Sequence, residues 1–348
     1  MMTEQIAAVL RACLFIAIAL LLCMVIFAAV GLSAIDTLRG VVEGAFFRPR
    51  AMDHVLRWGL PLLITSVGVV ICFRAGYFNI GAQGQFYMGA IAAAFAAEAL
   101  RGTSPLVAVP LCMLAGIVGG AIWALWPALL RVKAGADEVI STMMGNFIAA
   151  LVLVHVTSGP LKDPSGSGQA TSSLPVDAAH RISATTGTSP IILGITALVV
   201  LLGWWLTRRT AFGVLSGLAG RNPTMVTWQG ADVERIAIGA FLVSGAFAGL
   251  AGSIELLGPN GRLASGFLPA HGFTAVVIAL VASLSVLATV FVALFFGALA
   301  SAALYLPVMA GLPAAAIQII NASIALFITS RTEAAENLLS RWRARWKT

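Results

Sequence analysis

Long apolar runs separated by short polar segments dominate this chain, and the pattern predicts a bundle of membrane-spanning helices. The hydrocarbon core of a bilayer is about 30 Å thick, so a helix needs about 20 mainly apolar residues to cross it. We therefore predict an all-α, polytopic membrane protein with about ten transmembrane helices. The predicted spans are residues 6–32, 54–73, 80–98, 105–130, 139–158, 190–206, 236–257, 272–290, 292–309 and 313–330.

A long uncharged stretch near the C-terminal end of the sequence must contain a turn. Residues 273–312 form 40 consecutive positions without a charged side chain. As one helix they would extend about 60 Å, which is twice the hydrocarbon thickness. The chain must therefore turn back within this stretch, and we divide it near residue 291 because the sequence does not mark the turn clearly.

Polar residues interrupt the apolar pattern most sharply at residues 76–85. The segment carries three glycines and the side-chain amides of Asn79, Gln83 and Gln85 between two apolar runs. Irregular backbone and amides at membrane depth are tolerated only when they are buried in protein or line a wet cavity. We therefore predict a broken helix here that belongs to a transport path or a gate.

Two further polar side chains lie in predicted spans, Asn146 and Glu255. Together with Asn79, Gln83 and Gln85 they are our candidates for the translocation path. The structural alternatives are an interhelical amide hydrogen bond for Asn146 and a water-exposed interfacial carboxylate for Glu255.

Outside the predicted spans, the chain has two long polar segments and a basic tail. Residues 159–189 are predicted to form an outer loop, residues 207–235 a cytoplasmic loop and residues 331–348 a basic cytoplasmic tail that lies on lipid or in solvent. With both termini cytoplasmic, 13 of the 21 Lys and Arg residues fall on the inner side, as the positive-inside rule favours. Within the inner loop, Asn222 is a good N-cap, Pro223 a good first helical residue and Gly230 a good stop, which predicts a short helix. It is either a docking element or a plain connector.

Composition agrees with this interpretation. Hydrophobic residues make up 59% of the chain and charged residues 10%, which excludes a soluble globular protein. The net charge of +7 is explained by membrane topology rather than by nucleic acid. The four cysteines and four histidines show no metal-binding spacing, and no lysine follows a glycine as a phosphate-binding loop requires. We expect no cofactor in this chain, no enzymatic activity, and a separate nucleotide-binding partner if transport is driven by ATP.

Five ordered sequence blocks carry a resemblance to a known family. They are Asn79-Ile-Gly-Ala-Gln-Gly-Gln85, the Glu-Val-Ile-Ser-Thr block within 136–149, Ser158-Gly-Pro-Leu-Lys-Asp-Pro164, the inner loop 213–235, and 236–255 with its Ser-Gly-Ala and Leu-Ala-Gly pattern. Together they resemble the bacterial ABC-importer permeases of the branched-chain amino acid, ribose and nucleoside superfamily, in its nucleoside and simple-sugar branch. The resemblance covers about residues 55–330.

The resemblance implies a single permease domain, residues 1–348, in the bacterial cytoplasmic (inner) membrane. It implies nucleosides as the first substrate class and simple sugars as the second. The implied partners are a second, identical or related permease chain, a cytoplasmic ABC ATPase that binds ATP and Mg²⁺, and an extracytoplasmic substrate-binding protein. The implied ATPase-coupling residues are Asn222, Pro223, Thr224, Met225, Val226, Thr227, Trp228, Gln229 and Gly230. We expect a Val226→Asp substitution to abolish coupling and leave folding intact.

The sequence also departs from that family. Gln83 stands where the branch commonly has an acidic residue, and Ser-Leu-Ser-Val at 283–286 replaces a glycine-rich inner turn. An ion-coupled secondary transporter is the alternative from a different class, since such proteins also use broken helices near the midplane. Its weakness is the scarcity of carboxylates within the spans. A membrane scaffold without transport would leave the buried amides unexplained.

Overall fold

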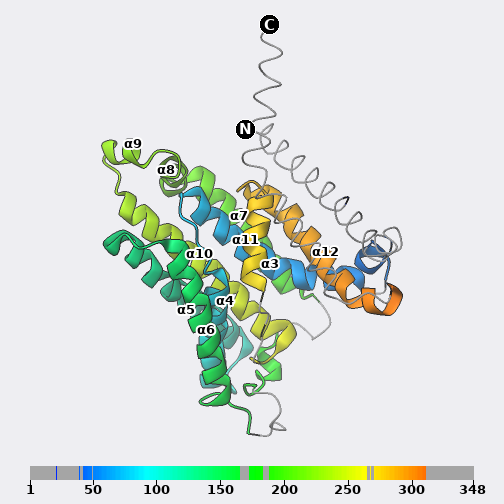
Figure 1. Cartoon of the computed structure of the whole chain (residues 1–348). Coiled ribbons are helices and arrows are strands. Elements are labelled where there is room, and N and C mark those ends of the chain that lie inside the picture. Colours follow the sequence, from blue (N-terminus) through cyan, green and yellow to red (C-terminus); the bar gives the residue numbers. More distant parts are fainter. Residues whose placement is uncertain are drawn as a thin grey trace.

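The computed structural model describes residues 42–48, 50–164, 172–182, 188–264 and 270–310, and the single positions 21, 39 and 267, with side chains up to residue 304. These residues form helices joined by short connections (Figure 1). The helices are α3 (Ala51–Arg74), α4 (Ala82–Ala99), α5 (Pro105–Ala134), α6 (Glu138–Ser158), α7 (Pro190–Arg209), α8 (Ala211–Ala219), α9 (Pro223–Trp228), α10 (Val233–Glu255), α11 (His271–Val281) and α12 (Val286–Ala310), with single helical turns at Glu43–Phe47, Ala178–His180 and Leu256–Asn260.

Six of these helices, among the described residues, are long and apolar enough to cross a membrane: α3, α5, α6, α7, α10 and α12. This confirms an all-helical, multi-pass protein, but it does not confirm about ten spans. The predicted spans 6–32 and 313–330 and the tail 331–348 lie outside the described residues. The predicted span 80–98 exists as α4, which is less apolar because it carries two glutamines and Glu98.

Our division of the long uncharged stretch is wrong. The first helix, α11, ends at Val281 after only 11 residues, and α12 begins at Val286. At 1.5 Å per residue, α11 is about 16 Å long and covers roughly half of the hydrocarbon core. The turn uses left-handed backbone at Ser283 (φ 51°) and Leu284 (φ 56°). Left-handed backbone is usually formed by glycine or asparagine, so local propensity did not reveal this turn. The family resemblance did place an inner turn at residues 283–286, where the structure has it.

The connections gather at two opposite ends of the bundle (Figure 1). At the α9 end, Lys133 pairs with Glu234 at 3.2 Å, and Gly76 packs against Gly220. At the other end, the guanidinium of Arg101 donates to the carbonyl oxygen of Pro175 at 3.0 Å. Segments predicted to lie on opposite sides of the membrane therefore occupy opposite ends of the molecule.

Glycines allow α5 and α10 to cross in close contact at the centre of the fold. A Cβ added at Gly120 would collide with the carbonyl oxygen of Gly245, and one added at Gly249 would collide with that of Gly116. The two glycine pairs, each spaced by four residues, thus face one another, as small-residue motifs do in membranes. Gly89 of α4 also meets Gly249, so three helices converge at this point, the glycine junction.

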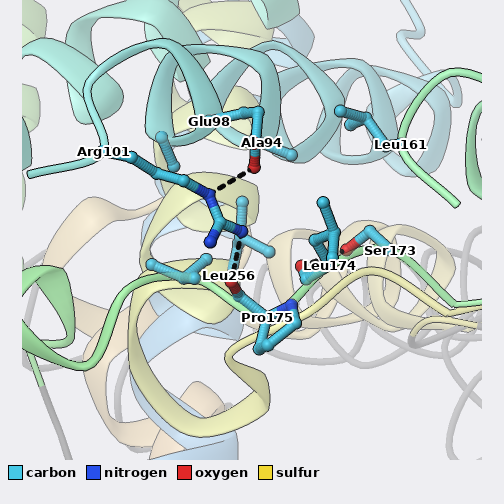
Figure 2. Close-up of a pocket in the computed structure, with 10 residues that line it drawn as sticks. Ala94, Glu98, Arg101, Leu161, Ser173, Leu174, Pro175 and Leu256 are labelled. Carbon is cyan, nitrogen blue, oxygen red and sulfur yellow. Dashed lines mark hydrogen bonds and ion pairs between the residues drawn. The ribbon is translucent and has the colours of Figure 1, made fainter. Parts of the chain in front are cut away.

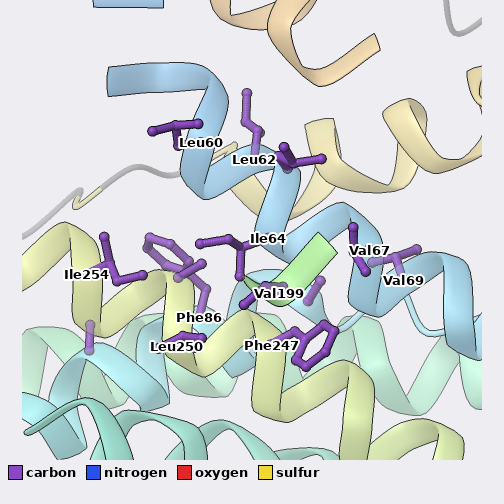
Figure 3. Close-up of a cluster of buried hydrophobic side chains, with 14 of the residues drawn as sticks. Leu60, Leu62, Ile64, Val67, Val69, Phe86, Val199, Phe247, Leu250 and Ile254 are labelled. Carbon is purple, nitrogen blue, oxygen red and sulfur yellow. The ribbon is translucent and has the colours of Figure 1, made fainter. Parts of the chain in front are cut away.

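Apolar side chains from four helices fill the space beside this junction. Figure 3 shows Ile64 of α3, Phe86 of α4, Val199 of α7 and Phe247 of α10 converging in one cluster. Ile64 and Phe86 are fully buried. Helices α3 and α10 are the most buried spans, whereas α5 and α7 keep much of their apolar surface exposed. The outward apolar faces suit contact with lipid or with another chain.

Candidate functional site

The connection between α3 and α4 runs from the α9 end into the middle of the bundle. It covers residues 75–81, so the predicted break at 76–85 is confirmed but is shorter: Gln83 and Gln85 already lie in the first turn of α4. Gly76 has φ 84°, and a Cβ there would lie 2.9 Å from the Cα atom of Gly220. Only glycine meets both the left-handed backbone and this close approach without strain.

Asn79 holds the connection against α10. Its amide nitrogen donates to the Ser244 hydroxyl at 2.9 Å and to the Gln85 side-chain oxygen at 3.0 Å. Its side-chain oxygen accepts from Gln85 Nε2 and from the backbone nitrogen of Gly81, both at 3.0 Å. Asn79 is fully buried, and these bonds use both donor hydrogens and both acceptor positions of its amide.

Asn146 holds the same connection from α6. Its side-chain oxygen accepts from the backbone nitrogen of Gly84 at 2.8 Å, and its amide nitrogen donates to the Ile80 carbonyl at 3.0 Å. The Thr142 hydroxyl accepts from the backbone nitrogen of Ile80 at 3.3 Å. The first turn of a helix and a broken segment both leave backbone groups unpaired, and here α6 side chains pair them.

Gln83 joins α4 to the start of α11. Its side-chain oxygen accepts from the backbone nitrogen of Gly272, and a Cβ at Gly272 would collide with the Gln83 backbone. The amide therefore caps the N-terminus of a half-length helix inside the bundle. An N-terminus attracts negative charge, so an acidic residue at this position would meet the same N–H group. A glutamine supplies the acceptor without the cost of burying a charge.

Glu255 lies in a different cluster, near the end opposite α9. Arg57 of α3 donates to its Oε1 atom at 2.9 Å, and Asn260 donates to the same atom at 3.0 Å. The Glu255 carboxylate is fully buried, and the Arg57 guanidinium also packs over the Trp58 ring at 4.2 Å. Glu255 is therefore not a water-exposed interfacial carboxylate, which corrects that alternative.

The Arg57–Glu255 pair borders a small hollow between α3, α10 and the start of α7. Its other lining residues are mostly aliphatic. Glu255 Oε2 and Arg57 Nη1 are buried without a hydrogen-bond partner within the described residues. Arg57 was not among the residues predicted from the sequence to belong to the site. The available signal was an arginine inside an apolar run, which is costly and marks a functional or paired position.

The structure thus brings four of the five path candidates together. Asn79, Gln83, Gln85 and Asn146 surround the α3–α4 connection, whereas Glu255 stands apart with Arg57. Each of these side chains has a hydrogen-bond partner in the chain, so their burial is explained by the fold. Contact between any of them and a transported molecule stays a prediction.

The predicted short inner helix is observed as α9, Pro223–Trp228. Asn222 caps it by accepting from the backbone nitrogen of Met225 at 3.0 Å, and Gly230 (φ 80°) follows its end. Val226 is fully buried and anchors the helix, whereas Met225 is 43% and Trp228 is 87% exposed. Because Val226 is buried among apolar side chains of α8 and α10, charging it would also disturb folding, so that part of our Val226→Asp expectation is wrong.

A second hollow lies at the end opposite α9, where part of the outer loop folds against α4. Figure 2 shows Arg101 between Glu98 and Pro175, with Leu174 and Leu256 alongside. The guanidinium of Arg101 pairs with Glu98 at 2.6 Å and donates to the Pro175 carbonyl. His180 Nε2 lies 2.9 Å from the carbonyl oxygen of Thr103. These contacts fix residues 172–182 to the end of α4.

Comparison with known proteins agrees with this architecture. Residues 51–328 match the family model described as the permease component of branched-chain amino acid transport systems. The chain is 31% identical over 292 residues to the glucose ABC transporter permease protein TsgB13 of Haloferax volcanii, covering 80% of this chain and 75% of the relative. It is 29% identical to the guanosine ABC transporter permease protein NupP of Bacillus subtilis, covering 83% of each chain. It is 27% identical to the nucleoside ABC transporter permease protein NupB of Lactococcus lactis, covering 88% of this chain and 87% of that one.

The matched region contains the α3–α4 connection, the glycine junction, the Arg57–Glu255 pair and α9, and it spans most of the chain. The protein therefore belongs to the family of permease components of branched-chain amino acid transport systems.

Proposed function

We propose that this chain is the membrane-spanning permease subunit of an ATP-driven importer that carries nucleosides, with simple sugars as the second substrate class. A partner ATPase would bind ATP and Mg²⁺, a second permease chain would complete the path, and an extracytoplasmic binding protein would deliver the ligand. The assembly would lie in the bacterial cytoplasmic membrane with both termini of this chain cytoplasmic. The similarity to guanosine and nucleoside transporter permeases and the Asn79–Gln85 block support the substrate class.

The observation that carries the proposal is the geometry of α9. A capped helix of one to two turns presents Trp228, 87% exposed, at one end of a membrane bundle. An exposed tryptophan beside an exposed methionine is typical of an energetic centre in a protein interface. The Val226 anchor joins α9 to the apolar cluster that contains Ile236 and Phe241 of α10. A push on α9 would therefore be transmitted to α10.

Helix α10 links α9 to much of the candidate site, because it contacts α3, α4, α5, α8 and α9. It packs at the glycine junction, supplies Ser244 to Asn79 and ends at Glu255. If closure of the ATPase moves α9, α10 would shift against α3, α4 and α5 together. ATP can drive that change only if it binds the closed ATPase more tightly than the open one.

A Trp228→Ala substitution tests the coupling role. We expect ligand-stimulated ATP hydrolysis to fall at least tenfold, because truncating an interface tryptophan commonly costs about 2 kcal/mol or more. The melting temperature of the isolated chain should stay unchanged, since Trp228 is exposed. Trp228→Phe, which keeps an aromatic surface, should retain most of the stimulation. Normal stimulation in Trp228→Ala would refute the coupling assignment.

Uptake measurements separate the remaining alternatives. Proteoliposomes that contain the complete transporter should accumulate radiolabelled guanosine or uridine only with ATP and the binding protein. Uptake of glucose instead would favour the sugar class. Uptake by this chain alone, driven by an imposed ion gradient, would establish a secondary transporter and overturn the proposal.

A further inference from the structure

Three arginines lie at the α9 end of the bundle, around the junction of α3, α7 and α8. Arg74 is the last residue of α3, Arg208 lies in the last turn of α7, and Arg221 follows α8. Within the described part of the chain, none of the three forms an ion pair with a carboxylate. We call this group the arginine cluster.

Other cations at the same end do have acidic partners. Arg131 pairs with Glu138 at 3.2 Å, Lys133 with Glu234 at 3.2 Å and Arg235 with Asp232 at 2.9 Å. Carboxylates at this end are thus used elsewhere, and the arginine cluster retains its full positive charge.

Arg74 is held in place by its backbone and by α8. A Cβ at Gly220 would collide with the Arg74 carbonyl oxygen, so α8 ends directly against α3. The guanidinium lies over Gly217, with Nη2 3.5 Å from the position that a Cβ would occupy there. Arg74 Nε is buried and has no hydrogen-bond partner in the described structure. Gly220, which touches Arg74, directly precedes Arg221, and α7, which carries Arg208, packs against both α3 and α8.

An exposed apolar stripe on α7 leads away from the cluster. Leu198, Leu201, Leu202 and Trp205 follow the i, i+3, i+4, i+7 spacing, so they share one helix face, and Arg208 continues the row from Leu201 and Trp205. Leu198 is 64% exposed, Leu201 63% and Trp205 51%. A cationic end, an interfacial tryptophan and a long apolar face occur in the order in which a phospholipid presents its phosphate, glycerol and acyl chains.

We propose that Arg74, Arg208 and Arg221 bind the phosphate headgroup of an anionic phospholipid whose acyl chains lie along the α7 stripe. Favourable placement of cations at helix C-termini explains Arg74 and Arg208 in part. Arg221 also follows a helix C-terminus, that of α8, but none of the three arginines has a carboxylate partner among the described residues. Guanidinium groups donate to phosphate in pairs, so a phosphate at this end would compensate positive charges that no carboxylate compensates. Free phosphate would leave the stripe unused, which is why we favour the lipid.

Native mass spectrometry of the purified transporter tests the proposal. Dodecyl maltoside micelles containing dioleoyl phosphatidylglycerol or dioleoyl phosphatidylcholine would be compared for wild type and variants. The main variant is Arg208→Gln/Arg221→Gln, which leaves the more buried Arg74 in place to protect folding. The control is Arg235→Gln, which removes one charge at the same end, where Arg235 is exposed and paired with Asp232.

We expect at least one phosphatidylglycerol to remain bound to wild type and phosphatidylcholine to bind less. Each basic residue near a membrane surface contributes about 1 kcal/mol, so the double variant should bind phosphatidylglycerol about 30-fold more weakly. Arg235→Gln should change the affinity by less than about threefold. Equal losses in both variants, equal binding of both lipids, or displacement of the lipid by millimolar inorganic phosphate would overturn the proposal.

Discussion

A Gly249→Ala substitution would test whether the glycine junction holds the centre of this fold. The added methyl group would collide with the Gly116 carbonyl oxygen and lie 2.9 Å from Gly120 Cα and 3.0 Å from Gly120 N. All three atoms belong to the backbone of α5, so no side-chain rotation relieves the contact. Ordinary contact requires 3.4 Å or more, so α5 and α10 must separate.

That separation cannot remain local. Gly252, three residues later on α10, has its own close contact with the Phe86 carbonyl oxygen on α4, so moving α10 away from α5 presses it on α4. Overpacking of this kind costs about 1–3 kcal/mol and sometimes more. The higher helix propensity of alanine returns about 0.5–1 kcal/mol. We expect a net loss of about 1–2 kcal/mol, or a melting temperature lower by roughly 2–8 °C on the scale of domains of 150–250 residues.

Gly194→Ala is the matched control. Gly194 also lies in a membrane helix, but a Cβ there would meet nothing within 4 Å. Differential scanning fluorimetry in detergent, with fluorescence-detected size exclusion before and after heating, would compare both variants with wild type. Gly194→Ala should match or exceed the wild-type melting temperature. If Gly249→Ala melts no lower than Gly194→Ala, the close crossing of α5 and α10 is refuted.

Three further predictions concern the buried polar groups. Asn79→Leu removes the acceptor of one backbone N–H and the hydrogen-bond partner of two side chains, so we expect the free energy of unfolding to fall by about 3 kcal/mol or more. An unchanged melting temperature would contradict the role of Asn79 in holding the connection. Gln83→Leu leaves the Gly272 backbone N–H without its acceptor and should lower the free energy of unfolding by about 1–3 kcal/mol, whereas Gln83→Glu should keep the acceptor. Equal melting temperatures of the two variants would contradict the capping role. Removing either partner of the Arg57–Glu255 pair should lower the free energy of unfolding by about 3–5 kcal/mol. The double variant Arg57→Met/Glu255→Gln should lose less than the two single variants together, and additive losses in this double-mutant cycle would show that the pair is not coupled.

Features that depend on neighbours in sequence were predicted well. The capping of α9 by Asn222, its start at Pro223 and the following Gly230 are as expected. Such features are set within one helical turn, so local sequence is sufficient to predict them. The two glycine pairs on α5 and α10 have the spacing of a packing motif. Only the structure shows that the two pairs face each other.

Features without a local signal were missed. The turn at residues 282–285 lies in an uncharged stretch and contains no glycine or asparagine, and two serines, Ser283 and Ser285, are the turn's only polar residues. Helix α8 was treated as part of a loop, because its small residues and glycines lower helix propensity. Packing against α7 and against the end of α3 compensates for that weakness.

The sequence by itself determined the class of this protein, because 348 residues with 59% hydrophobic side chains can fold only by burying most of them in a bilayer or in one another. It also determined that Asn79, Gln83, Gln85, Asn146 and Glu255 need partners, since a polar group in hydrocarbon must be paired. Only the tertiary structure decided which partners these are. Asn79 meets Ser244, 165 positions later, and Glu255 meets Arg57, 198 positions earlier. A side-chain amide pairs equally well with backbone, side chain or ligand, so its partner depends on which helices pack together, and that is a property of the whole chain.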